Sequence, residues 1–131
     1  MLEIFKTAGT GELIKLEQFE KGCWVNLFAP TVEEIRRVET ELAILPNFIR
    51  DPLDDEEKPH IDDEDNQILV VIDIPYVYEE DGAQIYETMP MGIIVTDDYM
   101  ITVSFRKNEI IEAVKRNRIK DFSTQKHTRF A

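Results

Sequence analysis

The longest uninterrupted apolar run in the chain is Ile68-Leu69-Val70-Val71-Ile72. Successive side chains of a strand point to opposite faces of the sheet, so a strand that is apolar at every position is typical of one covered on both faces. We therefore expect a central strand with other parts of the chain packed above and below it. The run is far too short for a membrane-crossing helix, which needs about 20 mostly apolar residues.

The strand pattern continues beyond this run. Ile85 to Thr96 and Tyr99 to Phe105 follow it, separated by turn signals at Asp81-Gly82 and Asp97-Asp98. Short connections of this kind join antiparallel strands, which predicts an antiparallel meander. Three further strands are predicted earlier in the chain, at Leu2 to Phe5, Leu13 to Leu16 and Cys23 to Phe28.

Two helices are predicted from capping signals. Thr31 is followed three residues later by Glu34, a capping box, and an apolar stripe at helical period comes next. Asn108 is a suitable N-cap for a closing helix with acids early and bases late. Strands and helices mix without strict alternation, which favours an α+β fold with a mixed, largely antiparallel sheet and helices packed on it. The residues of the apolar stripe are Ile35, Val38, Leu42 and Leu45.

The charge of the chain is strongly acidic and unevenly distributed. Acids outnumber bases 27 to 15 in 131 residues, a length typical of one domain, and this balance argues against nucleic-acid binding. Residues 51–65 hold nine of the acids against Lys58 alone. Such a stretch is commonly a solvated loop, but its oxygen donors also suit a hard cation such as Mg²⁺, bound weakly at an exposed and partly hydrated site.

The sequence offers little for catalysis. It contains two serines, one cysteine and two histidines. Cys23 stands beside Trp24 in a predicted strand and is expected in the core, while His60 lies among carboxylates and is expected to be a solvated side chain. The chain lacks the four His and Cys ligands of a structural zinc site, and we predict that it is not an enzyme. A single cysteine, which cannot form an internal disulfide, and the absence of an Asn-x-Ser/Thr glycosylation acceptor fit a reducing cytoplasm.

Several short segments form a distinctive series when taken in order. Together they resemble the N-terminal cytoplasmic domain of CorA-type magnesium transporters, and Thr124-x-Lys126-x-x-Arg129-Phe130 is similar to the entry of that family's stalk helix. The segments are Trp24-Val25-Asn26-Leu27, Pro30-Thr31-x-Glu33-Glu34, Leu45-Pro46-x-Phe48-Ile49-x-Asp51-Pro52-Leu53-Asp54, Lys58-Pro59-x-Ile61-Asp62 and Tyr86-Glu87-Thr88-Met89-Pro90-Met91-Gly92.

The resemblance implies a homopentameric channel for Mg²⁺, often also for Co²⁺ or Ni²⁺. It implies that residues 1–120 form a regulatory α/β domain, an α/β/α sandwich, and that residues 121–131 begin the stalk helix or form a truncated tail. The two membrane helices of the family, with their Gly-Met-Asn signature, are missing from this sequence. The fragment is thus expected to be soluble, at the cytoplasmic face of the membrane.

The resemblance also implies metal-binding residues. Asp51 matches the family's sensing aspartate, and Asp54 and Asp55 are added as metal candidates from proximity alone. The preceding position, which can be acidic in the family, is Arg50 here. The family's second carboxylate comes from the stalk helix of a neighbouring subunit, so we expect weak Mg²⁺ binding by the isolated domain. In the alternative interpretations Asp51 is a helix cap or turn former, and the chain is a stand-alone acidic domain that docks a basic protein partner.

Overall fold

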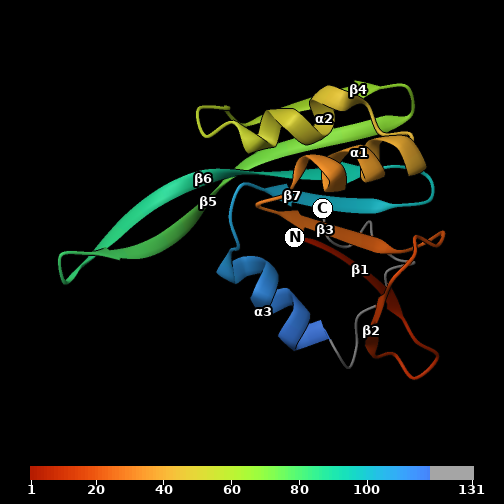
Figure 1. The fold of residues 1–131 in the computed structure, drawn as a ribbon, viewed down its shortest axis with the longest axis horizontal. Helices are drawn as coiled ribbons and strands as arrows, with labels where there is room; N and C mark the ends of the chain where they lie inside the picture. The colour runs from red at the N-terminus through yellow and green to blue at the C-terminus, as the bar shows by residue number, and fades with distance from the viewer. Residues whose placement is uncertain (119–131) are drawn as a thin grey trace.

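The computed structural model describes residues 1–118, which fold around one seven-stranded sheet (Figure 1). The strand order is β2-β1-β3-β7-β6-β5-β4. The strands are β1 (Leu2–Thr7), β2 (Leu13–Leu16), β3 (Trp24–Phe28), β4 (His60–Glu64), β5 (Gln67–Glu80), β6 (Ala83–Val95) and β7 (Met100–Ser104). The helices are α1 (Val32–Glu41), α2 (Pro46–Arg50), the 3₁₀ turn η1 (Asp51–Leu53) and α3 (Glu109–Arg118).

The sheet is mixed and largely antiparallel, as predicted. The central strands β3 and β7 pair in parallel, and every other neighbouring pair within residues 1–118 is antiparallel. β5, β6 and β7 form the expected meander. β5 and β6 continue past the sheet as a twisted two-stranded ribbon that ends at Asp81-Gly82 (Figure 1).

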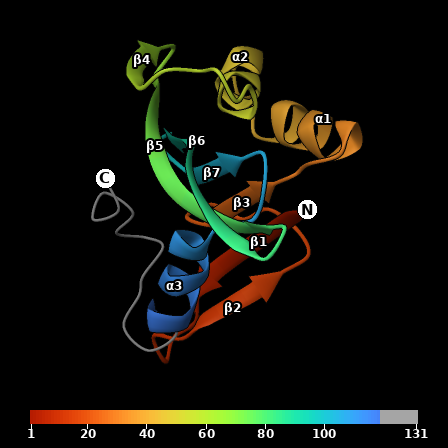
Figure 2. The same ribbon diagram turned by 90° about the vertical axis from the view of Figure 1, so that its left-hand side faces the viewer.

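Helices cover both faces of the sheet, which confirms the sandwich (Figure 2). One apolar core lies under α1, α2 and η1, and includes Val38, Phe48 and Ile49. The other lies under α3 and includes Trp24 and Ile111. Alternate residues of the central strands enter the two cores, because neighbouring side chains in a strand point to opposite faces.

The apolar run of β5 is not central in the sheet. Leu69 and Val71 are buried beneath α2, but Ile68 is 39% exposed, because β5 is the second strand from the edge. The edge strand is β4, which lies within the acidic stretch whose composition is typical of a solvated loop. β4 pairs along its whole length with β5, and these backbone hydrogen bonds order a segment whose composition favours solvent.

Both predicted helix starts are confirmed. The hydroxyl of Thr31 accepts a hydrogen bond from the backbone nitrogen of Glu34 at 3.2 Å, and the Glu34 carboxylate accepts one from the backbone nitrogen of Thr31 at 2.9 Å. Asn108 Oδ1 accepts a hydrogen bond from the backbone nitrogen of Ile111 at 2.8 Å, which caps α3. These contacts satisfy amide donors that the first turn of a helix leaves free.

No helix within residues 1–118 combines the length and the apolar character needed to cross a bilayer. The predicted stalk entry, residues 121–131, and the predicted domain boundary at residue 120 lie outside the described residues.

Candidate metal centre

Asp51 lies where α2 passes into η1. Phe48 and Ile49 of α2 and Pro52 of η1 are buried against the sheet, so the backbone on both sides of Asp51 is fixed by packing. The Asp51 side chain itself remains partly accessible to solvent. The local sequence therefore presents a carboxylate from a short helical segment whose apolar side chains are anchored in the core.

The edge strand β4 brings two more polar side chains to this carboxylate. His60 and Asp62 are two residues apart on β4 and point to the same face, as alternate strand residues do. One ligand atom from each of Asp51, His60 and Asp62 lies within 4.8 Å of the others. The structure thus assembles a group of two carboxylates and one imidazole from two elements.

The imidazole ring of His60 is held at both nitrogens. Nδ1 lies 2.7 Å from the backbone oxygen of Lys58, and a carbonyl only accepts hydrogen bonds, so Nδ1 carries a hydrogen atom. Nδ1 also lies 3.4 Å from a carboxylate oxygen of Glu57. Nε2 faces Asp62 Oδ2 at 3.3 Å. In the neutral ring, Nε2 therefore has a free lone pair on the side of the two aspartates.

The environment of His60 favours positive charge. The hydrogen bond to the backbone oxygen of Lys58 raises the pKa of His60 above its ordinary value, and burial, the next largest effect, opposes this. The carboxylates of Asp62, Glu57 and Asp51 raise the pKa of His60 further. A positive charge in this group, whether a proton or a metal ion, offsets the repulsion between carboxylates that face one another.

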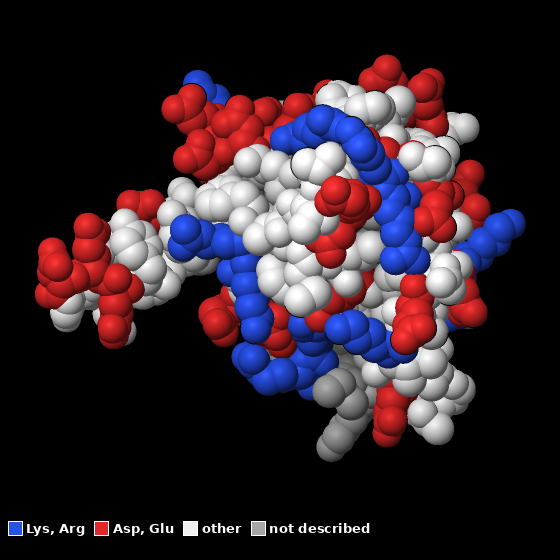
Figure 3. All heavy atoms as spheres, viewed as in Figure 1, with Lys and Arg blue, Asp and Glu red and all other residues white. Residues whose placement is uncertain are grey.

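The three aspartates named from the sequence have different surroundings. Asp51 belongs to the group with His60 and Asp62. Asp54 and Asp55 are exposed and are not part of that group, and Asp54 Oδ1 accepts a hydrogen bond from the backbone nitrogen of Glu56 at 3.0 Å. Figure 3 shows the acidic side chains gathered over the connection between α2 and β4, and at the tip of the β5–β6 ribbon.

His60 and Asp62 were missed as candidate ligands by sequence reasoning. The available signal was the segment His60-Ile61-Asp62-Asp63-Glu64 between a proline and an Asp-Asn turn, which is compatible with a short strand. A predicted strand there would have placed the two side chains on one face. It would not have shown that Asp51 lies opposite them.

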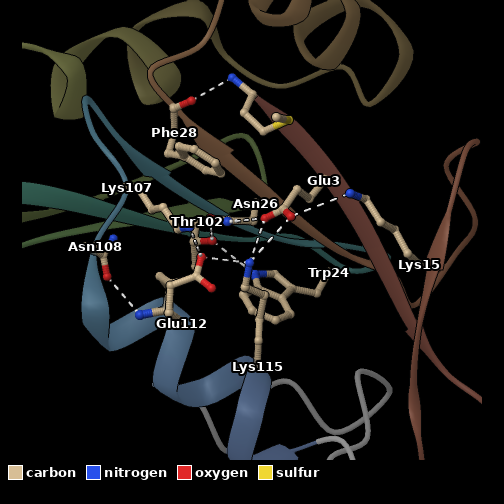
Figure 4. A network of polar contacts seen from close by, with 12 residues as sticks. Glu3, Lys15, Trp24, Asn26, Phe28, Thr102, Lys107, Asn108, Glu112 and Lys115 are labelled. Carbon is tan, nitrogen blue, oxygen red and sulfur yellow. Dashed lines mark hydrogen bonds and ion pairs between the residues drawn. The ribbon is translucent and has the colours of Figure 1, made fainter.

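A second polar network fixes α3 on the other face of the sheet (Figure 4). Trp24 Nε1 donates to Thr102 Oγ1 at 3.0 Å, and Thr102 Oγ1 donates to Asn26 Oδ1 at 2.8 Å. Asn26 Nδ2 donates to Glu3 Oε1 at 3.0 Å, and Lys115 Nζ of α3 donates to the same oxygen at 3.1 Å. Charged hydrogen bonds therefore connect α3 to β1 and, through Asn26, to the central strand β3.

The two charged members of this network shift one another's pKa. Burial acts to raise the pKa of Glu3, but the hydrogen bonds from Asn26 and Lys115 and the nearby lysine charges outweigh it and lower the pKa. Burial acts to lower the pKa of Lys115, but the bonds to Glu112 and Glu3 outweigh it and raise the pKa. Both groups are therefore charged around neutral pH.

Glu3→Gln is expected to lower the free energy of unfolding by about 1–2 kcal/mol at neutral pH, because a charged hydrogen bond to Lys115 is lost. Since the folded-state pKa of Glu3 lies below its unfolded value, its contribution is complete above the unfolded pKa and is lost as pH falls through the folded pKa. Urea unfolding of both proteins as a function of pH measures this. The difference in unfolding free energy between wild type and Glu3→Gln should shrink at acid pH.

The control for this substitution is Glu12→Gln, because Glu12 is exposed and its side chain forms no salt bridge within residues 1–118. Glu12→Gln should leave stability within about 0.5 kcal/mol of wild type. A Glu3→Gln loss that stays constant down to low pH would contradict the ion-pair explanation.

Comparison with known proteins gives one family match. A family model described as CorA-like Mg²⁺ transporter protein matches residues 19–130. A search of curated protein sequences gave no match.

Solved structures share the fold. The complete CorA magnesium transporter of Methanocaldococcus jannaschii has a TM-score of 0.72 at 19% identity over 89% of this chain and 36% of its own. The full-length CmaX protein has a TM-score of 0.70 at 12% identity over 98% of this chain and 42% of its own. The ZntB cytoplasmic domain of Vibrio parahaemolyticus has a TM-score of 0.65 at 12% identity over 92% and 51%. The chain thus spans about a third to a half of these structures.

Proposed function

The chain belongs to the family of CorA-like Mg²⁺ transporter proteins, and we propose that it is the ion-sensing cytoplasmic domain of a divalent-cation transporter. In this proposal it carries no transport or enzymatic activity alone. It binds Mg²⁺ through Asp51 at the interface between subunits of a homopentamer at the cytoplasmic face of the membrane, and bound Mg²⁺ favours the closed state.

The overlap between the family match and the candidate metal centre supports the proposal. The segment that matches the family model, residues 19–130, includes the whole group formed by Asp51, His60 and Asp62. Asp51 is a partly accessible carboxylate on a helical segment that Phe48, Ile49 and Pro52 anchor in the core, so its position is fixed while its oxygens stay available. Mg²⁺ keeps several waters and takes one or two carboxylates, which suits a site that a neighbouring subunit completes.

Charge gives the proposed site its ability to switch. Neither Asp51 nor Asp62 forms a salt bridge with a lysine or an arginine within residues 1–118. When a second subunit adds a further carboxylate, repulsion opposes the closed interface until a cation binds. A ligand shifts such an equilibrium only by its difference in affinity for the two states.

Weak binding at each site is sufficient for a complete switch. Moving a two-state equilibrium from 1:99 to 99:1 requires about 10⁴-fold preferential binding in total. If five equivalent sites act together, a preference of only about sixfold at each site reaches that total. A site that binds Mg²⁺ poorly in the isolated domain is therefore compatible with steep closure of the pentamer.

In this proposal, the polar network between α3 and the sheet transmits the effect of ion binding to the rest of the transporter. Lys115 ties α3 to Glu3 of the sheet, and α3 runs directly into the segment that begins at residue 119. In the proposal, the stalk helix begins in residues 121–131. A shift of the sheet at the subunit interface is then transmitted through α3, because the Glu3–Lys115 contact resists sliding between them.

The test is Asp51→Asn in the full-length transporter that contains this domain. Removal of the negative charge should raise the Mg²⁺ concentration for half-closure by about tenfold or more, because a carboxylate ligand is replaced by a neutral amide. Flux through the reconstituted protein, measured against internal Mg²⁺, gives this concentration.

The matched control is Asp63→Asn. Asp63 neighbours Asp62 on β4 and points to the opposite face, so the change in net charge is the same while the metal group is untouched. If Asp51→Asn and the control Asp63→Asn close at the same, unchanged Mg²⁺ concentration, the sensing role of Asp51 is contradicted.

The second candidate function, an acidic domain that docks a basic protein, is favoured by one observation. The edge strand β4 exposes acidic side chains, and Ile61 between them is 71% exposed. An edge strand is a ready surface for a partner chain. A salt-sensitive complex with a basic protein that is unaffected by Asp51→Asn would support this function over ion sensing.

A further inference from the structure

We propose that Asp51, His60 and Asp62 form a binding site for a transition-metal dication of the Co²⁺, Ni²⁺ or Zn²⁺ class, complete within a single chain. This inference deepens the proposed function and rests on it for the role of the site, because it gives the sensing aspartate a second class of ion. The binding itself requires no neighbouring subunit.

The ligand types select this class of ion. Imidazole nitrogen suits Zn²⁺, Ni²⁺ and other first-row transition ions, whereas carboxylates and water suit Mg²⁺. Two carboxylates and one imidazole leave further coordination positions for water, as in exchangeable sites with three protein ligands. The site therefore binds a borderline cation more tightly than Mg²⁺, which gains little from His60.

The distances are close to those of a metal site. Ligand atoms about 2.1 Å from a common ion lie about 3.0–3.4 Å apart in octahedral or tetrahedral geometry. Nε2 of His60 and Oδ2 of Asp62 are 3.3 Å apart, so these two ligands already have the required separation. All three ligand atoms lie within 4.8 Å of one another, which places the Asp51 carboxylate beside this pair.

The orientation of His60 provides an independent indication. A metal-binding histidine usually donates its second ring N–H to a backbone carbonyl or a carboxylate, which fixes the tautomer and aims the other nitrogen at the ion. Here Nδ1 donates to the backbone oxygen of Lys58 at 2.7 Å, with the Glu57 carboxylate at 3.4 Å. Neither of these groups belongs to the three ligands, and together they leave Nε2 directed toward Asp62.

The surrounding charge favours a cation at this point. Asp51 and Asp62 have no lysine or arginine partner within the described part of the chain, so their repulsion is relieved only by His60 or by an added cation. The His60 side chain is 29% exposed, which leaves the site open to ions from solvent. Packing of Pro52 and pairing of β4 with β5 hold the ligands in place before an ion arrives.

The experiment is a titration of the 131-residue chain with Co²⁺, followed by its visible absorption and by calorimetry, with a parallel Mg²⁺ titration. Wild type should bind one Co²⁺ per chain. His60→Gln replaces the ring nitrogen with an amide oxygen, and it should weaken Co²⁺ binding by about tenfold or more while changing Mg²⁺ binding by less than about twofold.

Two control variants accompany it. Asp63→Asn changes the same strand on its opposite face and should keep the wild-type Co²⁺ affinity. His127→Gln changes the other histidine of the sequence and should also keep it. Co²⁺ binding that is equally tight in His60→Gln, or that falls by the same factor as Mg²⁺ binding, would overturn the inference.

Failure of the proposed function is separable from failure of this inference. The Co²⁺ titration reports the single chain, and the flux assay of Asp51→Asn reports Mg²⁺ closure of the full-length protein. Tight Co²⁺ binding lost in His60→Gln supports the inference even where Asp51→Asn leaves closure unchanged. Absence of a Co²⁺ spectrum in wild type overturns it even where Asp51→Asn impairs closure.

Discussion

Phe48→Ala should lower the free energy of unfolding by about 3–5 kcal/mol, the range for truncating a large aromatic side chain in a core. Phe48 is fully buried between α2 and the sheet, within the core that also contains Ile49 and Leu69. α2 has only five residues, and helices shorter than about 12 residues are marginal in isolation. The position of α2 therefore depends on the burial of Phe48 rather than on helix propensity.

The consequence extends to the candidate metal centre, because Asp51 directly follows α2. Denaturant unfolding measures the stability loss as a lower midpoint at an unchanged slope. Ile61→Ala is the control, since Ile61 is 71% exposed on β4, and it should change stability by about 0.5 kcal/mol or less. A loss below about 1 kcal/mol for Phe48→Ala would show that the side chain is not packed as described.

Gly92→Ala should destabilise the protein by about 1–3 kcal/mol through overpacking. Gly92 lies in β6, paired with Val71 and Val103, and a Cβ atom there would overlap Pro52 Cγ and lie 2.9 Å from Pro52 Cβ. A glycine within a strand often marks the close approach of another part of the chain, and here that part is the Pro52 ring of η1. The methyl group would push η1, and Asp51 with it, away from the sheet.

A double-mutant cycle isolates this contact. Pro52→Ala removes the ring that the added methyl group would strike, so Gly92→Ala should cost less in the Pro52→Ala protein than in wild type, with a coupling of about 0.5–3 kcal/mol. Gly9→Ala is the control, because a Cβ at Gly9 meets no atom within 4 Å. Strictly additive losses from the two substitutions would contradict the steric explanation.

Much of the fold was predictable because its signals are local. The capping box at Thr31, the N-cap at Asn108 and the turn residues at Asp81-Gly82 each fix the backbone through contacts between near neighbours in sequence. Apolar runs then predicted the meander and the burial of Cys23, which is fully buried. Such features need no knowledge of distant parts of the chain.

The acidic stretch is where local reasoning was insufficient. Its composition favours solvent, yet His60 pairs with Val71 and Glu64 with Gln67, so β4 is formed by hydrogen bonds to β5 rather than by its own propensity. The same pairing makes β4 the edge of the sheet and moves the apolar strand β5 one place inward from that edge.

The sequence by itself predicted the layered α+β domain and its two capped helices, and the family resemblance pointed to Asp51 as a metal candidate. Only the tertiary structure decided that His60 and Asp62 lie opposite Asp51. That juxtaposition depends on the register of the β4–β5 hairpin and on one long-range contact, the packing of Pro52 against Gly92. The contact between Pro52 and Gly92 leaves no local signal in the sequence, because β4, β5 and part of β6 lie between these two residues along the chain.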